Sequence, residues 1–439
     1  MLDVAPNLLG EAVSAECTAA DSSLVNCNEV PAAADSVQAE GERAWLTPGV
    51  RGIGTASFFA DVGHEIPTAL LPSLLTSILG APAAALGVIE GVSDALAGAA
   101  RFGGGVLADD PSRRRKVAVG GYATTAVLGA ATAGATAVCQ VGVLRAAAWT
   151  ARGLRVPARN ALLADIVPAK AYGRAYGFER MMDNLGAIFG PLLALGLVAW
   201  LGVTWAIGLS VIPGLLAAAA IIYAIRQTPR PTSRDKVPLK IRIRPVLTGD
   251  LGRLMGAVAA FEVGNVAATL LILRASELLA PEHGTKTATT IALGLYTAYN
   301  VAATIASIPA GRMSDRLGAR GPVLVLTGGV AAFALAYGLF SVNSPVIAFL
   351  AVPFLLAGVG IGAVETAQHS AVAALAPKDL RGSAFGMLAT VQSLGNLAAS
   401  TVAGVLWTTL SPTAAFTYLT AWMLFALVGL LVAARRRGH

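Results

Sequence analysis

The chain has 439 residues, of which 55% are hydrophobic and only 13% are charged. A soluble globular domain carries about 25% charged residues, so this composition excludes a disordered protein and argues against a large soluble enzyme. The net charge of +7 is unevenly distributed, because residues 1–50 hold eight acids and one base, which leaves +14 for residues 51–439.

Residues 1–50 are rich in Ala, Ser, Glu and Asp, and we expect them to form a disordered, acidic, cytoplasmic extension. This segment lacks a basic stretch followed by an apolar one, so no cleavable signal peptide is predicted. The three cysteines, Cys17, Cys27 and Cys139, have no metal-ligand spacing, and no disulfide framework is expected.

From residue 51 onward, the chain divides into apolar stretches long enough to cross a bilayer, which needs roughly 20 residues per helix. The runs are continuously apolar rather than alternating, which favours helices over a β-barrel. The sequence therefore predicts an all-α integral membrane protein with twelve transmembrane helices. The predicted spans are 52–79, 83–107, 117–138, 141–163, 173–200, 203–225, 252–279, 288–310, 322–342, 345–368, 382–409 and 413–434.

Basic residues gather in alternate connections between these spans, which by the positive-inside rule places those connections and both termini in the cytoplasm. The longest basic stretch, residues 226–250, is predicted to link two six-helix bundles, residues 51–225 and 251–434. Residues 435–439 form a basic cytoplasmic tail. The positive charge thus reports topology, and no nucleic-acid partner is expected.

The two predicted bundles carry matching motifs. Gly105 and Asp109 after the second span match Gly311 and Asp315 after the eighth, at an offset of 206 residues. Later pairs recur at an offset of 209: Pro168/Pro377, Gly177/Gly386 and Gly186/Gly395. Parallel repeats of this kind are one plan for secondary transporters; chance similarity between Gly-rich apolar runs is the alternative.

The loop from Gly105 to Lys116 resembles the loop signature of the major facilitator superfamily: Gly, Asp, a base, Gly and then a basic pair. It departs from that signature at Asp110, where a base is usual, and at Pro111-Ser112, where Gly is usual. The second copy, Gly311 to Arg320, is closer to the signature. The resemblance covers about residues 51–434. It implies two pseudo-symmetric six-helix bundles and a monomeric carrier that moves a small-molecule solute across the lipid bilayer by alternating access.

These two loops are candidates for a cytoplasmic gate. The loop aspartates can accept hydrogen bonds from a neighbouring helix N-terminus, and the arginines can pair with acids at an adjacent helix end. The alternative is that the bases only set topology and bind anionic lipid. The candidate gate residues are Gly105, Asp109, Arg113, Arg114, Arg115, Gly311, Asp315 and Arg316.

The fifth span contains Gly186, Gly190 and Pro191, which is similar to the Gly-x-x-x-Gly-Pro motif of the superfamily's drug:proton antiporters. Two glycines four residues apart permit close helix packing, and a proline can bend the helix. The later glycine pair of that motif is replaced by Ala194-Leu195, and an ordinary small-residue packing face is the alternative. The motif favours proton-coupled efflux, with proton-coupled uptake as the runner-up.

Ionisable residues inside the predicted spans are candidate transport groups, because charge is costly in a bilayer. The resemblance implies that helices 1, 4, 7 and 10 line the central cavity. Asp61 and Glu65 are expected to form a proton site tuned by an arginine from the fourth helix; a permanent ion pair is the alternative. The candidate cavity residues are Asp61, His64, Glu65, Arg145, Arg152, Glu262 and Glu365.

A second set of charges offers either a proton relay or structural ion pairs: Glu90, Asp94, Glu179, Arg180 and Asp183. A divalent-metal or metal-complex transporter is a further alternative, because His64, Asp61 and Glu65 could form a metal-binding triplet; their spacing is not diagnostic, and no resident metal is predicted. His369, one turn after Glu365, could join a metal site, but a local hydrogen bond is the expectation.

Protons are the expected coupling ion, and no cofactor is predicted. The chain has no phosphate-binding Gly-x-x-x-x-Gly-Lys-Ser/Thr loop, and its four histidines form no recognised catalytic motif, so an enzyme is not expected. A membrane enzyme and a non-transporting sensor are the rival functions from other classes. Neither the substrate nor the direction of transport can be read from the sequence.

Overall fold

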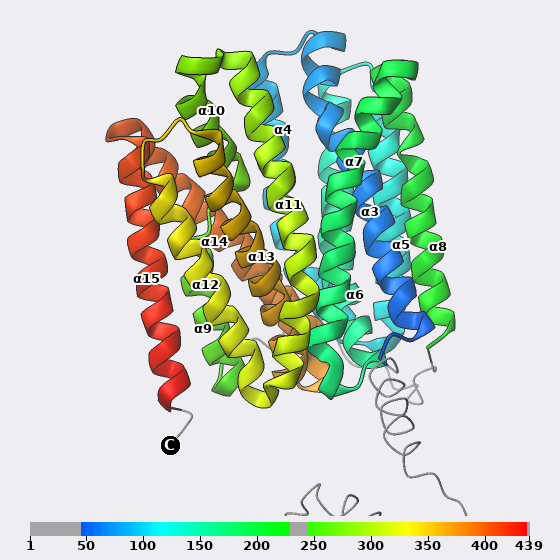
Figure 1. The fold of residues 1–439 in the computed structure, drawn as a ribbon. Coiled ribbons are helices and arrows are strands. Elements are labelled where there is room, and N and C mark those ends of the chain that lie inside the picture. The colour runs from blue at the N-terminus through cyan, green and yellow to red at the C-terminus, as the bar shows by residue number, and fades with distance from the viewer. Residues whose placement is uncertain (1–44, 229–243, 437–439) are drawn as a thin grey trace, which may run out of the picture. The chain divides into compact units, whose positions relative to one another are not determined.

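The computed structural model describes residues 45–228 and 244–436, and in this part the chain forms helices and no strand. The helices make twelve spans, as predicted (Figure 1). The long helices are α3 (Pro48–Ser73), α4 (Ala83–Ala108), α5 (Pro111–Ala131), α6 (Val138–Ile166), α7 (Tyr172–Leu209), α8 (Val211–Arg226), α9 (Gly249–Glu262), α10 (Ala268–His283), α11 (Thr285–Arg316), α12 (Gly321–Phe340), α13 (Ile347–Leu375), α14 (Arg381–Thr409) and α15 (Pro412–Arg436).

Four spans differ in detail from their predicted form. The seventh is two helices, because the chain leaves the helical conformation after Glu262 and resumes it at Ala268. The fifth and sixth spans are separated only by Gly202, whose φ of +80° turns the chain within α7. The third starts at Pro111 rather than 117, because Asp110 caps the helix and accepts hydrogen bonds from the Ser112 and Arg113 amides.

The chain folds into two halves, which we call the N half (α3 to α8) and the C half (α9 to α15). Within each half, helices approach closely at small residues: a Cβ on Gly63 would lie 2.8 Å from the Gly214 nitrogen, and one on Gly358 would lie 2.9 Å from the Ala302 Cβ. Such close approach supplies packing where lipid offers little hydrophobic drive between helices.

Both halves present one end with the basic connections, which we call the basic end: it carries residues 109–116, 166–172, 226–228, 316–320 and 376–381. In Figure 1 it is the lower end, from which the C-terminus emerges. Most of the predicted extension, most of the predicted linker and the last three residues of the predicted tail lie outside the described residues.

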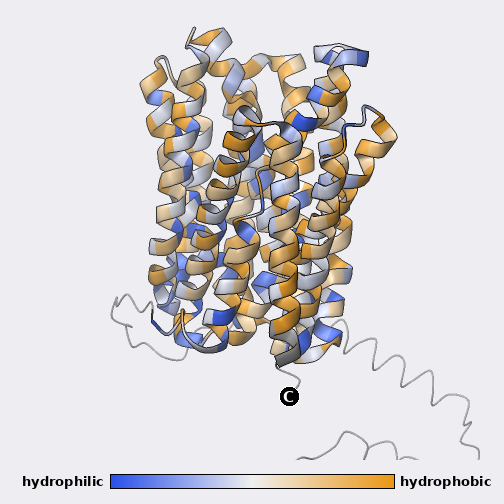
Figure 2. Ribbon diagram, turned by 90° about the vertical axis from the view of Figure 1, so that its left-hand side faces the viewer, coloured by the Kyte–Doolittle hydropathy of each residue, from blue (hydrophilic) through white to orange (hydrophobic). Residues whose placement is uncertain are grey.

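The outer surface is apolar, as expected for helices in lipid. Trp200, for example, is 88% exposed and Phe425 is 68% exposed. Hydrophobic residues extend along the helices in Figure 2, and hydrophilic segments gather toward the end where the C-terminus emerges. In the described residues, six helical stretches are by themselves long and apolar enough to cross a membrane. Helices α3, α4 and α6, which carry intramembrane charges, are not among them.

Candidate functional site

The two halves meet at the basic end through a crossed pair of aspartate contacts. Asp109, after α4 of the N half, accepts hydrogen bonds from the Ser383 amide (2.8 Å) and hydroxyl at the start of α14. Asp315, near the end of α11, accepts them from the Gly173 amide (2.7 Å) and the Arg174 amide (3.0 Å) at the start of α7. Each loop aspartate therefore caps a helix of the opposite half, as its charge and the helix dipole favour.

Glycines allow this crossed contact. A Cβ on Gly105 would lie 2.6 Å from the Gly382 carbonyl oxygen and 2.8 Å from the Gly386 Cα, and a Cβ on Gly311 would collide with the Gly173 carbonyl oxygen. The matched motifs of the internal repeat thus meet each other across the molecule. We call this set of contacts the junction; α7 and α11 lie side by side at its edge (Figure 1).

Arginines surround the junction. Arg114, buried at the start of α5, pairs with Asp165 at the end of α6, and the Arg381 guanidinium reaches the same carboxylate across the halves at 3.1 Å. Arg113 pairs with Asp110 at 3.3 Å. The remaining two candidates, Arg115 and Arg316, lie in α5 and at the end of α11.

The two neighbouring aspartates of the first loop differ electrostatically. Burial raises the pKa of Asp109, and the hydrogen bonds from Ser383 offset only part of that effect. Burial would also raise the pKa of Asp110, but hydrogen bonds from the Ser112 side chain and amide and from the Arg113 amide hold it below its usual value. Asp110 is therefore the stably ionised cap of α5.

In the N half, helices α3 and α6 bring a carboxylate, a histidine and an arginine together. Asp61 is 6% exposed, and its Oδ1 lies 3.3 Å from an Arg152 nitrogen. The same guanidinium lies 2.5 Å from His64 Nε2, which is 3.7 Å from Glu65 Oε1. Arg152, which belongs to the fourth span, thus contacts Asp61 directly, and Asp61 is one of the two carboxylates of the predicted proton site. We call these four residues the Asp61 cluster.

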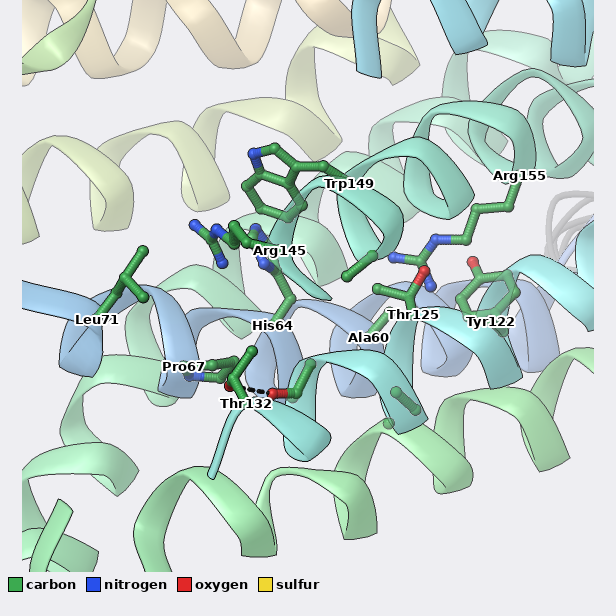
Figure 3. A pocket seen from close by; sticks show the side chains of 15 residues that line it. Ala60, His64, Pro67, Leu71, Tyr122, Thr125, Thr132, Arg145, Trp149 and Arg155 are labelled. Atoms are coloured by element: carbon green, nitrogen blue, oxygen red, sulfur yellow. Dashed lines mark hydrogen bonds between the residues drawn. The ribbon is translucent and has the colours of Figure 1, made fainter. Parts of the chain in front are cut away.

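Trp149 lies among the cations of this region (Figure 3). Its ring packs edge-on to His64, with 4.2 Å between ring centroids, and the Arg145 and Arg152 guanidinium carbons lie 4.1 and 5.1 Å from its centroid. The ring face thereby attracts two guanidinium groups in a buried site. The adjoining cavity has about 20 Å³ of free volume, enough for about one water molecule.

The second set of predicted charges is divided between two groups of ion pairs. Arg145 pairs with Glu90 at 3.0 Å. Asp94, one turn further along α4, interacts electrostatically with Arg145 and with Arg101. The other three residues of this set, Glu179, Arg180 and Asp183, form a separate ion-pair network.

That network centres on Glu179, which is 1% exposed and lies 2.9 Å from Arg159 and 2.7 Å from Arg180. Asp183 lies 3.3 Å from Arg159 and 3.2 Å from Arg180. Arg180 also approaches Glu365 of the C half at 3.7 Å, so the network reaches across the two halves.

The C half holds its buried carboxylate differently. Glu262, the last residue of α9, is 4% exposed and accepts hydrogen bonds from the Asn265 amide (3.0 Å) and the Gln368 amide (3.1 Å). Gln392 in turn donates to the Gln368 side-chain oxygen at 2.7 Å. We call these four residues the Glu262 cluster. Sequence reasoning singled out Glu262 but missed its three amide partners.

The comparisons with known proteins decide the family. The family model of the Major Facilitator Superfamily matches residues 53–275 and 254–439. The chain belongs to the Major Facilitator Superfamily. As a member it is a multi-pass membrane protein for secondary transport of small-molecule solutes.

Two relatives match along most of the chain. An uncharacterized MFS-type transporter of Methanocaldococcus jannaschii is 28% identical over 85% of this chain and 92% of its own. An uncharacterized protein of Mycobacterium tuberculosis is 28% identical over 76% of this chain and 81% of its own.

Solved structures of two transporters share the fold. A bacterial homologue of the iron transporter ferroportin in the outward-facing state has a TM-score of 0.69, with 14% identity over 88% of this chain and 98% of its own. The human organic anion transporter MFSD10 has a TM-score of 0.66, with 15% identity over 88% of this chain and 100% of its own.

Within the superfamily fold, the antiporter-like motif lies against the Asp61 cluster. A Cβ on Gly186 would lie 2.8 Å from the Asp61 Cβ, and one on Gly190 would collide with the Glu65 Cβ. Pro191 follows inside α7. Gly395, the repeat partner of Gly186, packs in the same way against Glu262.

The conceivable metal triplet does not assemble. Among the described residues, no three His, Cys, Asp or Glu side chains are grouped so as to hold a metal ion. His64 faces the Arg152 guanidinium, whose charge would repel a metal cation. His369 Nδ1 lies 2.7 Å from the Glu365 carbonyl oxygen, the local hydrogen bond that was expected.

Proposed function

We propose that this transporter exports a small solute across the cytoplasmic membrane in exchange for protons. The observation that carries the proposal is the junction. Hydrogen bonds and ion pairs join the two halves at the basic end, while the buried charges of the Asp61 cluster lie further along the helices. Rocking of the two halves, with the junction forming and breaking, would alternate access to these charges.

The depth of Asp61 supports a role in transport. It lies thirteen residues after the start of α3 at Pro48, which at 1.5 Å per residue corresponds to roughly 20 Å along the helix. That depth lies inside a hydrocarbon core about 30 Å thick, where ionisable residues mark substrate or proton pathways.

The distribution of basic residues supports the orientation of the protein. The basic end carries the arginines of the junction, and the positive-inside rule assigns such an end to the cytoplasm. The junction is then the cytoplasmic gate, and the opposite end faces outward.

The motif of α7 supports exchange rather than uptake. Gly186 and Gly190 place α7 directly against the face of α3 that carries Asp61 and Glu65. A packing motif that resembles that of drug:proton antiporters therefore lies next to titratable carboxylates. In this proposal, Asp61 and Arg152 bind the solute through charge.

A proton-flux assay tests this function. Purified protein is reconstituted in vesicles that contain a pH-sensitive dye, and a panel of probes is added outside: ethidium, fluorescein and Co²⁺. If the protein is an antiporter, at least one probe should enter in exchange for protons and make the lumen alkaline. Asp61→Asn and Arg152→Gln should each reduce this proton flux, because each variant leaves the charge of the other residue uncompensated. The two single variants must each remain monodisperse.

The sign of the signal separates the alternatives. Acidification of the lumen would identify a proton symporter and overturn exchange. Probe movement without any pH change would overturn proton coupling, and chemical conversion of a probe would identify an enzyme. Unchanged flux in both Asp61→Asn and Arg152→Gln would remove the Asp61 cluster from the solute site.

A further inference from the structure

Glu262 occupies an unusual place in the seventh span. It lies thirteen residues after the start of α9 at Gly249, so it has the same depth in the C half as Asp61 has in the N half. The helix ends at Glu262, and the chain runs without helical structure through residues 263–267 before α10 begins. Broken helices in secondary transporters are places where substrates and coupling ions bind.

The break is held by side chains from three other helices. The Val266 amide donates to the Tyr337 hydroxyl at 3.3 Å, and the Ala267 amide donates to Ser400 Oγ at 2.9 Å. Asn396 donates to the Asn265 carbonyl oxygen at 2.9 Å, and the Trp422 indole donates to the Ala260 carbonyl oxygen at 2.7 Å. Because these backbone groups have partners, the break is a built feature that fixes the position of Glu262.

The carboxylate of Glu262 is surrounded by amides rather than by a cation. Among the described residues, the groups that act on it are Asn265 and Gln368, which donate hydrogen bonds, and Glu365, which carries the same charge. The titratable groups from neighbouring helices are Tyr299 of α11 and Tyr337 of α12, which interact with Glu262 electrostatically. None of these supplies a positive charge.

Three carboxylates of the N half lie beside an arginine. Asp61 lies beside Arg152, Glu90 beside Arg145 and Glu179 beside Arg159. An arginine cannot release its proton, so it stabilises only the ionised form of its partner. An arginine partner therefore favours the ionised state of such a carboxylate.

Amide partners serve both forms of a carboxyl group. The side-chain amides of Asn265 and Gln368 donate to the ionised carboxylate, and after an amide flip they can accept the hydrogen bond of the protonated acid. The half-buried Gln392 extends this set of amides through its hydrogen bond to Gln368. The surroundings of Glu262 therefore suit a group that is charged in one state and neutral in the other.

We propose that Glu262, held at the break of the seventh span by Asn265 and Gln368, carries the coupling proton. This proposal rests on proton-coupled transport as the function and names the residue that performs the coupling. It differs from the expectation from sequence, which placed the proton on Asp61 and Glu65. Protonation neutralises Glu262 within the apolar interior, and deprotonation returns the charge when the site faces the other side.

Dicyclohexylcarbodiimide, an apolar reagent that adds to protonated carboxyl groups, tests this assignment without a known solute. The purified protein in detergent is labelled over a range of pH, and the modified fraction of each carboxyl-bearing peptide is measured by mass spectrometry. We expect labelling at Glu262 that falls about tenfold per pH unit above its midpoint, as for a single titrating acid. We expect little labelling at Asp61 in the same digest.

Two variants sharpen the assignment. Glu262→Gln removes the label at this position. Gln368→Arg places an arginine beside Glu262, as the N half has at the equivalent position, Arg159. This arginine should keep Glu262 ionised and abolish its labelling. Its folding is checked by size-exclusion chromatography, and if it does not fold, the pH titration of the unmodified chain still decides.

Labelling of Asp61 or Glu65 with Glu262 unlabelled would overturn the proposal. Three other results would also overturn it: labelling of Glu262 that does not change with pH, labelling of Glu262 that is undiminished in the folded Gln368→Arg variant, or protection of Glu262 from the reagent by Na⁺ rather than by raised pH. In vesicles, Glu262→Gln should lose the response of transport to a pH gradient. If the unmodified chain moves protons but Glu262 is not labelled, only the assignment of the proton to Glu262 is refuted. If labelling of Glu262 depends on pH but no proton flux is measured, only proton-coupled transport is refuted.

Discussion

The two halves of this transporter make the same contacts at the basic end and different ones in their interiors. At the basic end, Asp109 and Asp315 each cap a helix of the opposite half, and Gly105 and Gly311 each pack against the start of that helix. In the interiors, positions that are equivalent by the repeat offset of 209 hold different side chains. The N half has the ion pair of Arg159 with Asp183, and the C half has the hydrogen-bonded amides of Gln368 and Gln392.

This difference indicates a division of work between the halves. In the proposed transport cycle, the junction closes symmetrically as the halves rock against each other, which accounts for the matching aspartates and glycines in both copies. The interiors have no such constraint. The N half pairs most of its buried carboxylates with arginines, whereas the C half places Glu262 among neutral hydrogen-bonding groups.

The largest effect on stability is expected in the interior of the N half. Glu179→Gln leaves Arg159 and Arg180 buried with less compensating charge, and breaking a buried pair in this way costs about 3–5 kcal/mol. Gln392→Ala in the C half removes one neutral hydrogen bond, worth about 0.5–1.5 kcal/mol. Thermal unfolding in detergent measures both. Equal losses would contradict the distinction between a charged and a neutral interior.

At the junction, the expected effect is on the opening of the basic end rather than on unfolding. Asp315→Ala removes two backbone hydrogen bonds and the ion pair with Arg174, which is 2.9 Å long, while Asp109→Ala removes the contacts with Ser383. Hydrogen bonds to charged groups contribute about 1.5–3 kcal/mol each, so both variants should favour opening of the basic end, and Asp315→Ala more strongly. Reactivity of a cysteine that replaces Ser307, which is buried against Gly177 of the N half, reports the opening in each background. A larger effect of Asp109→Ala would contradict this ranking.

The smallest effect concerns a place where the repeat is imperfect. Asp110 caps α5, whereas the repeat offset of 206 places Arg316 at the equivalent position. Loss of the cap in Asp110→Ala should cost about 1 kcal/mol at neutral pH. Because hydrogen bonds lower the pKa of Asp110 in the folded protein, this contribution is present above its unfolded pKa and lost as the pH falls through its folded pKa. Thermal unfolding across this pH range checks it, with Arg316→Ala as the matched control.

The candidate site could be predicted only in part from the sequence. Carboxylates and arginines within apolar spans were identifiable because charge there is costly, so Asp61, Arg152 and Glu262 could be singled out. Their partners could not, because each contact joins different helices: Arg152 reaches Asp61 from α6, and Gln368 reaches Glu262 from α13. The offset of 209, applied to Arg159 and Asp183, was the signal that would have pointed to Gln368 and Gln392.

The sequence by itself determined the twelve spans, the two-bundle fold and the superfamily, because hydrophobic length and repeated motifs are local properties of the chain. Only the tertiary structure decided how the charges are shared. It divided the second set of charges between separate groups of ion pairs, broke the seventh span at residues 263–267 and surrounded Glu262 with amides. The reason is physical: the cost of a buried charge depends on what packs against it, and those neighbours come from segments far apart in the sequence.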